Sequence, residues 1–225
     1  MASARRGHVV RTRIKFCGIT RADDALHGAA LGVDAIGFVF TRASQRFVGI
    51  GQARAIRAEL PPFVTAVALF MDDEPGWIEE VVSGVQPDLL QFHGAETDRF
   101  AASFARPYMK AVPMASVADA ARHVAEFPNA AGFLLDSHAR GARGGTGRTF
   151  DWARVPSPGA HPYVLAGGLT PQNVAEAIAV VRPYGVDVSS GIESAPGIKD
   201  QAKMSAFVAA VRAFDATTGP TPLQR

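Results

Sequence analysis

Short apolar segments recur along the chain, and each is followed by turn residues and then by apolar positions at helical spacing. Eight segments have the character of strands: RIKFCGI, DAIGFVF, FVTAVALF, DLLQFHG, PYMKAV, AAGFLLD, HPYVLAG and GVDVSSG. Strand and helix thus alternate eight times, which is the pattern that closes a parallel (β/α)8 barrel. The sequence therefore predicts an α/β protein with TIM-barrel architecture, whose chemistry is expected where the strands end.

The length of the chain fits a single domain. A barrel of this kind typically needs roughly 250 residues, so 225 residues leave little for a second domain. We expect a flexible N-terminal extension over residues 1–10, the barrel over 11–214 and a flexible polar tail over 215–225. Residues that commonly cap helices predict helix starts at Thr20, Ser116 and Thr170.

Composition excludes several classes of function. The 23 basic residues nearly balance the 21 acidic ones and are dispersed, which argues against nucleic acid as a partner. No apolar run approaches the roughly 20 residues of a membrane span, and we expect a cytoplasmic protein. Cys17 is the one cysteine, and no CxxC or HExxH motif offers metal ligands, so neither a metal nor a cofactor is expected. The oligomeric state stays open between monomer and homodimer.

Two small-residue turns follow the last two strands. AGGL contains Gly167 and Gly168, and the next turn contains Ser189, Ser190 and Gly191. Glycine lets backbone N–H groups approach an anion, serine adds a hydroxyl donor, and barrels commonly hold phosphate after strands seven and eight. Such residues also simply make tight turns, which explains either turn taken alone. Two of them at adjacent strands favour a phosphorylated small-molecule ligand.

Two groups that can exchange protons stand at strand ends. Cys17 closes the first strand and Asp136 closes the sixth, so a small substrate at the mouth of the barrel can meet one on each side. Each residue also has an ordinary explanation, because a buried cysteine packs as a small hydrophobe and an aspartate after a strand forms turns or caps. Their shared position at the active rim favours an acid–base pair.

Three further features are candidates for substrate binding. Arg46 can hold a carboxylate with its planar guanidinium, although a lone loop arginine is commonly just solvated. His93 can act as an acid, as a donor to substrate, or simply as a hydrogen-bonded histidine at the rim, which is the default interpretation. The long loop after strand six, with Gly145 and Gly147, is either an exposed connection or a glycine-hinged cover over the site.

Several motifs together resemble the phosphoribosylanthranilate isomerase family of tryptophan biosynthesis. They occur in order between Lys15 and Phe214: KFCGIT, DAIGFVF with SQRFV, DLLQFHG, LLDS with GGTG and FDW, AGGL, and DVSSGIES with PGIKD. The resemblance implies an isomerase that converts N-(5′-phosphoribosyl)anthranilate into its 1-deoxyribulose isomer by an Amadori rearrangement, with no cofactor or metal. A set of motifs in register is far more specific than any one of them.

The resemblance also implies roles for individual residues. Cys17 matches the general base, Asp136 the general acid, and Arg46 the partner of the anthranilate carboxylate. Gly168, Ser190 and Gly191 match the phosphate site. SQRFV stands where SPRYV is usual, which leaves the guanidinium in place. The chemistry requires a raised pKa for Asp136 and a lowered pKa for Cys17.

Two alternatives remain open at this point. The histidine-pathway aminoaldose isomerase performs the same kind of rearrangement but uses a pair of aspartates, whereas the first strand here ends in Cys17. A barrel that binds a phosphorylated sugar without turnover needs neither a proton donor nor an acceptor. The presence of both Cys17 and Asp136 argues against that second alternative.

Overall fold

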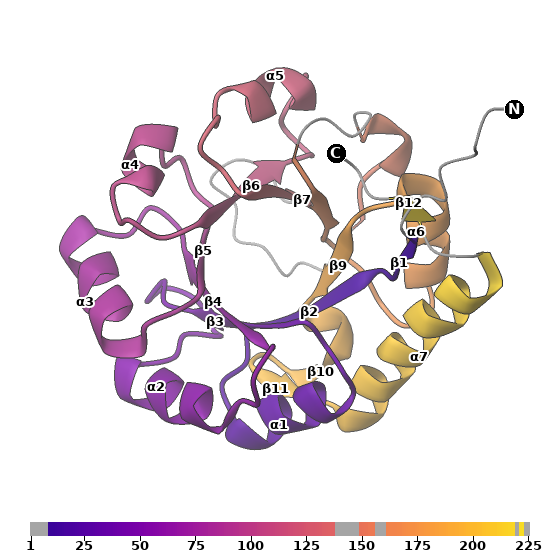
Figure 1. The fold of residues 1–225 in the computed structure, drawn as a ribbon, viewed down its shortest axis with the longest axis horizontal. Helices are drawn as coiled ribbons and strands as arrows, with labels where there is room; N and C mark the ends of the chain where they lie inside the picture. The colour runs from indigo at the N-terminus through magenta and orange to yellow at the C-terminus, as the bar shows by residue number, and fades with distance from the viewer. Residues whose placement is uncertain (1–8, 138–148, 156–160, 219–220, 223–225) are drawn as a thin grey trace, which may run out of the picture.

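The computed structural model describes residues 9–137, 149–155, 161–218 and 221–222. Eight parallel strands form a closed barrel in chain order, and the pairing of the first with the last completes the ring (Figure 1). The strands are β2 (Arg13–Cys17), β3 (Ala35–Val39), β4 (Thr65–Phe70), β5 (Leu89–Phe92), β6 (Tyr108–Pro113), β7 (Gly132–Asp136), β8 (Tyr163–Leu165) and β9 (Gly185–Val188). The predicted (β/α)8 barrel is confirmed.

Helices surround the barrel on the outside (Figure 1). They are α1 (Ala22–Ala30), α2 (Ile50–Glu59), α3 (Pro75–Val85), α4 (Asp98–Ala102), α5 (Ala120–Ala125), α6 (Val174–Val181) and α7 (Gln201–Thr218). Between β7 and β8, the described residues contain a single 3-10 turn, η1 (Trp152–Arg154). After β9 come a second 3-10 turn, η2 (Ser190–Ile192), and a hairpin of β10 (Glu193–Ala195) with β11 (Ile198–Lys199).

Alternation along the strands separates two cores. Outward side chains such as Ile14 and Phe16 belong to the large core between barrel and helices. A smaller apolar cluster is formed by Met109, Ala111, Leu134 and Ala166. Lys15, Gln91 and Asp187 are also buried, so polar groups share the barrel wall with these apolar ones. Buried polar groups of this kind need partners, and their partners define the site described below.

The predicted helix starts are wrong in detail. Thr20 does not cap α1; its hydroxyl donates to the backbone oxygen of Gly197 instead. The side chain of Asp119, not Ser116, accepts a bond from the first turn of α5. The helix expected from Thr170 begins later, at Val174. For Thr20, a contact with a distant residue takes the side chain, whereas the hydroxyls of Ser116 and Thr170 make local bonds, to Pro113 and from Gln172.

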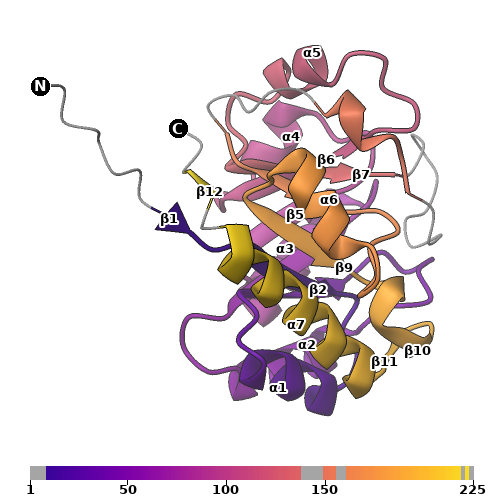
Figure 2. The same ribbon diagram turned by 90° about the vertical axis from the view of Figure 1, so that its right-hand side faces the viewer.

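The two ends of the described chain meet at one end of the barrel. α7 continues past Phe214 to Thr218, and the Asp215 carboxylate accepts bonds from the backbone N–H and the hydroxyl of Thr12 at 3.0 and 2.7 Å. β1 (Val9–Val10) pairs with β12 (Thr221–Pro222) at the end of the barrel opposite to the β10–β11 hairpin (Figure 2). The domain limits expected from sequence stay predictions.

Among the described residues, no helix combines the length and apolar character needed to cross a bilayer.

Candidate active site

The two candidate proton-transfer groups close two strands of the barrel. Cys17 is the last residue of β2 and Asp136 is the last residue of β7, and both are buried, with 6% and 7% of their surface exposed. β8 and β9 lie between their strands in the ring. Because all eight strands are parallel, both residues stand at the same end of the barrel, as expected for a site at the carboxyl ends.

His93 is in direct contact with Asp136. Its Nε2 lies 3.0 Å from Oδ2 of Asp136, and its Nδ1 lies 2.9 Å from Nε2 of Gln91. With the Gln91 amide donating to Nδ1, the ring proton sits on Nε2 and points at the carboxyl group. His93 is therefore hydrogen-bonded at the rim and holds the carboxyl group of Asp136 in place, while its contact with the substrate stays a prediction.

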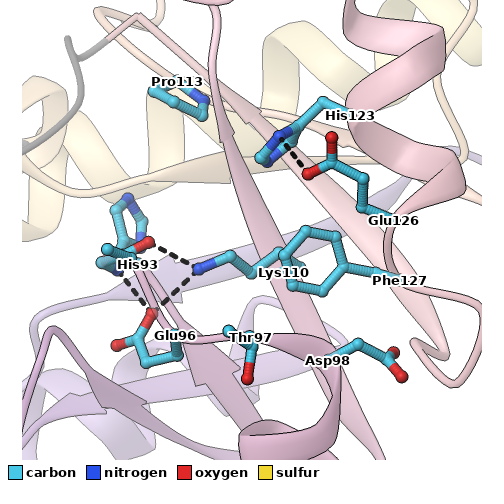
Figure 3. A pocket seen from close by; sticks show the side chains of 11 residues that line it. His93, Glu96, Thr97, Asp98, Lys110, Pro113, His123, Glu126 and Phe127 are labelled. Carbon is cyan, nitrogen blue, oxygen red and sulfur yellow. Dashed lines mark hydrogen bonds and ion pairs between the residues drawn. The ribbon is translucent and has the colours of Figure 1, made fainter.

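A buried ion pair fixes the turn that carries His93. Lys110 on β6 donates to the backbone oxygen of Gly94 at 2.6 Å and to Oε2 of Glu96 at 2.8 Å. The same carboxylate accepts the backbone N–H groups of Gly94 and Asp72. Figure 3 shows this network in the wall of a cavity of about 220 Å³, next to His93. The network is structural support for the site, because a satisfied buried pair holds one geometry.

The pKa of Cys17 is raised, which corrects the lowered value expected from sequence. Burial is the main cause, since a thiolate loses hydration there; the Lys15 ammonium opposes it, Asp187 adds to it, and Lys199 opposes it more weakly. The sequence argument foresaw favourable charges but not the depth of burial. The direction expected for the pKa of Asp136 stays a prediction.

Lys15 is a charged neighbour of Cys17 that the sequence reasoning missed. Two residues before Cys17 on β2, it faces the same side of the strand, and its Nζ lies 2.9 Å from Oδ1 of Asp187 on β9. Gly37 on β3 leaves room for both groups: a Cβ there would lie 3.0 Å from Lys15 Nζ and 3.1 Å from Cys17 Sγ. The sequence does contain a signal for this contact: side chains two positions apart on a strand share a face, and Lys15 is two positions before Cys17.

Arg46 stands beside the end of β2 and is held by Glu193. Its Nε and Nη2 bind the two carboxylate oxygens at 2.8 Å each. Lys199 binds the same carboxylate at 2.8 Å and also donates to the backbone oxygen of Ser189. The geometry leaves Nη1 of Arg46 outside the bidentate pair. Nothing in the sequence reasoning had identified Glu193 or Lys199.

The two small-residue turns lie against each other. Gly167 and Gly168 have φ angles of +83° and +65°, which side chains rarely allow. A Cβ on Gly191 would lie 1.9 Å from the backbone oxygen of Leu169, so the turn after β9 touches the turn after β8. Ser189 and Ser190 stand at the start of η2 beside this contact. The predicted neighbourhood of the two turns is confirmed.

Two of the predicted binding residues, Gly145 and Gly147, lie outside the described residues. Within the described ranges, no group of three or more His, Cys, Asp or Glu side chains is arranged to hold a metal ion.

Comparison with known proteins decides the family. Residues 14–210 match the family model for N-(5′-phosphoribosyl)anthranilate isomerase. The chain belongs to this family. A relative from Xanthomonas oryzae pv. oryzae, named N-(5′-phosphoribosyl)anthranilate isomerase, is 53% identical over 211 residues, which cover 91% of this chain and 95% of the relative. The resemblance inferred from the motifs is confirmed.

Solved structures agree with this family. One is a phosphoribosylanthranilate isomerase in complex with reduced 1-(o-carboxyphenylamino)-1-deoxyribulose 5-phosphate; it has a TM-score of 0.75 and 37% identity and covers 90% of this chain and 99% of its own. Another shows generated monomers of the dimeric isomerase from Thermotoga maritima, with a TM-score of 0.76, 36% identity and the same coverage. These similarities favour the isomerisation of phosphoribosylanthranilate over the histidine-pathway isomerase and over a barrel that binds without turnover.

Proposed function

We propose that Cys17 and Asp136 carry out the reaction for which the family is named, the isomerisation of N-(5′-phosphoribosyl)anthranilate in tryptophan biosynthesis. The observation that carries the assignment is their common position at the carboxyl end of the barrel, in a chain that matches the family over residues 14–210. Asp136 is the general acid and Cys17 is the general base.

The reaction divides into two proton transfers. The Asp136 carboxylic acid protonates the ribose ring oxygen while the C1′–O bond breaks, and the nitrogen lone pair forms a C=N bond. The Cys17 thiolate then removes the C2′ proton, and the C–H electrons form the C1′–C2′ double bond as the C=N pair returns to nitrogen. The resulting enolamine tautomerises to the aminoketone. The contact from His93 orients Asp136 for the first step.

The remaining site residues bind the substrate. The turns containing Gly167, Gly168, Ser189, Ser190 and Gly191 hold the phosphate, supported by their mutual contact and by a structural relative that binds a phosphorylated product analogue. Arg46, oriented by Glu193, meets the anthranilate carboxylate with Nη1. Gly145 and Gly147 stay substrate-binding candidates from the sequence alone. No cofactor or metal takes part.

Two substitutions test the assignment. Cys17→Ala and Asp136→Asn should each lower kcat by ~10²–10⁴, because general acid–base contributions have this size. Steady-state loss of substrate fluorescence measures the effect, and Asp23→Asn on the exposed face of α1 is the matched control. Turnover within a few fold of the parent in either variant, with the fold intact by circular dichroism, removes that residue from the mechanism.

We further propose that the chain acts in the cytoplasm as a homodimer. Phosphorylated sugars do not cross membranes unaided, which places their conversion in the compartment where they are made. For the dimer, support comes from the dimeric relative and from Phe63, which is fully exposed beside an apolar cavity of about 560 Å³ at the amino-terminal end of the barrel. Reciprocal insertion of Phe63 satisfies the self-complementarity of a two-fold interface.

A further inference from the structure

Lys15 is a buried cation that the reaction as described above does not use. Only 5% of its surface is exposed, and its ammonium is held against Asp187, the residue opposite it in the β2–β9 register. A lone ammonium at this depth loses hydration, which lowers its pKa, but Asp187 and Cys17 more than offset that loss and the pKa of Lys15 is raised. Lys15 is therefore a permanent positive charge inside the barrel at neutral pH.

The geometry directs this charge at Cys17. Both side chains leave the same face of β2, and both lie next to the space that a side chain at position 37 would fill. A Cβ added to Gly37 would lie 3.0 Å from Nζ and 3.1 Å from Sγ. The ammonium and the sulfur therefore lie on one side of β2, where the charge of each acts on the other. Space and direction are thus provided by the strand register itself and by a glycine on the next strand.

Four other charged groups face or surround the thiol. Lys199 on β11 and Arg46 before α2 interact with it as cations, and Glu193 on β10 is bound to both of them. Asp187 on β9 completes the set. Together with Lys15 these are three cations and two carboxylates, so the cluster carries one positive charge while Cys17 is a thiol. Ionisation of Cys17 brings it to neutrality, which a buried environment favours.

We propose that Lys15 is a positioning residue for the reaction, whose ammonium, held by Asp187, stabilises the Cys17 thiolate and so makes Cys17 a base. The inference rests on the proposed function, because it gives that base its means of ionisation. Burial opposes the thiolate, and Lys15 is the strongest influence in its favour, so without Lys15 the fraction of thiolate at neutral pH falls.

Titration of the thiol tests the proposal. Cys17 is the one cysteine of the chain, so the ultraviolet absorbance of the thiolate, corrected with the Cys17→Ala variant, reports this group alone. Lys15→Met should raise the pKa of Cys17 by at least about one unit, since an opposite charge nearby is worth about 1–3 units. Lys15→Arg keeps the charge and should keep the titration close to the parent.

Kinetics separate this role from a structural one. The active form needs Cys17 deprotonated and Asp136 protonated at the same time, so Lys15→Met should lower kcat/KM about tenfold or more at pH 7, whereas Lys15→Arg should stay within a few fold of the parent. A packing defect in Lys15→Met would instead lower activity and the free energy of unfolding while leaving the titration of the thiol in place.

The controls make each result decisive. Lys110→Met removes another buried lysine, one bound to Glu96 on the far side of the wall, and should leave the pKa of Cys17 unchanged. If Lys15→Met does not fold, Asp187→Asn serves instead: it removes a negative charge that raises the pKa of Cys17 while keeping an oxygen for Lys15, so that pKa should fall.

An unchanged Cys17 titration in Lys15→Met, or an unchanged or raised one in Asp187→Asn, overturns the proposal. The base assignment fails separately, through full turnover by Cys17→Ala.

Discussion

Glu193 holds two cations at the mouth of the barrel, and its charge depends on them. Burial raises the pKa of Glu193, but the bonds from Arg46 and the charge and bond of Lys199 outweigh burial, and the pKa is lowered. The carboxylate is thus ionised at neutral pH and fixes the direction of Arg46 through two bonds of 2.8 Å. In the proposed mechanism this makes Glu193 the residue that aims Arg46 at the substrate.

Glu193→Gln should therefore weaken substrate binding and lower the free energy of unfolding. Loss of the charge frees Arg46 to turn, and KM should rise about tenfold, equivalent to about 1.4 kcal/mol, with kcat little changed. Lys199 keeps its buried charge without a full partner, which should cost on the order of 3 kcal/mol in the free energy of unfolding. Steady-state kinetics and urea unfolding measure the two effects, with Glu80→Gln on the exposed face of α3 as control.

The stability effect should also depend on pH. A carboxyl group whose folded-state pKa is lowered adds stability above its unfolded-state pKa of about 4.3, and loses it as pH falls through the folded-state value. The gap in unfolding free energy between parent and Glu193→Gln should be constant near neutral pH and should shrink as the pH falls below about 5. A gap that stays constant over that range contradicts the assignment of the stability to the ionised carboxylate.

Single residues differ in how far the sequence predicts them. Cys17 and Asp136 could be found because a strand end is visible in the apolar pattern, and parallel strands bring their ends together. The raised pKa of Cys17 could not, because it depends on burial and on Asp187, a residue far along the chain. Glu193 belongs to this second group, since its importance appears only when Arg46 is seen to reach it.

For helices and strands, too, most features with local causes could be predicted from the sequence and those with distant causes could not. All eight strands were predictable, because turn residues bound short apolar runs and the helix spacing begins after each one. The starts of α1, α5 and α6 were not, since Thr20 bonds to Gly197, whereas Asp119 and Asn173 take the cap positions. The start of α1 therefore depends on a contact that sequence spacing does not contain, whereas Asp119 caps α5 through a local bond from Arg122.

The contact between the two turns that are proposed to hold the phosphate yields a prediction for these elements. Gly191→Ala places a methyl group 1.9 Å from the backbone oxygen of Leu169, so one turn must move. KM should rise about tenfold or more while kcat falls less, and the misfit should cost roughly 1–3 kcal/mol of stability. Gly76→Ala, where a Cβ has open space, is the control for steady-state kinetics and thermal unfolding. A KM and a stability equal to those of the parent in Gly191→Ala would contradict this prediction, because the contact between the turns would then not matter for either.

The whole molecule has two distinct ends. The carboxyl ends of the strands carry Cys17 and Asp136, while the amino-terminal end opens into the cavity of about 560 Å³ beside Phe63. Phe63 has a φ angle of 71°, which is uncommon for a bulky residue, and its side chain is fully exposed. In the proposed homodimer, this end is the face that meets the second copy.

The homodimer is tested by replacing Phe63. Phe63→Asp should raise the Kd of the dimer about thirtyfold or more, since losing a central aromatic contact costs about 2 kcal/mol or more. Sedimentation equilibrium over a concentration series should give the parent twice the 23.7 kDa mass of one chain, and the variant a mass near one chain. Val180→Asp, at another exposed apolar side chain on α6, should remain dimeric.

Since the candidate active site lies at the other end of the barrel, kcat should stay at the parent value in both variants. A parent that sediments as a monomer at every concentration would refute the dimer and leave the catalytic assignment untouched.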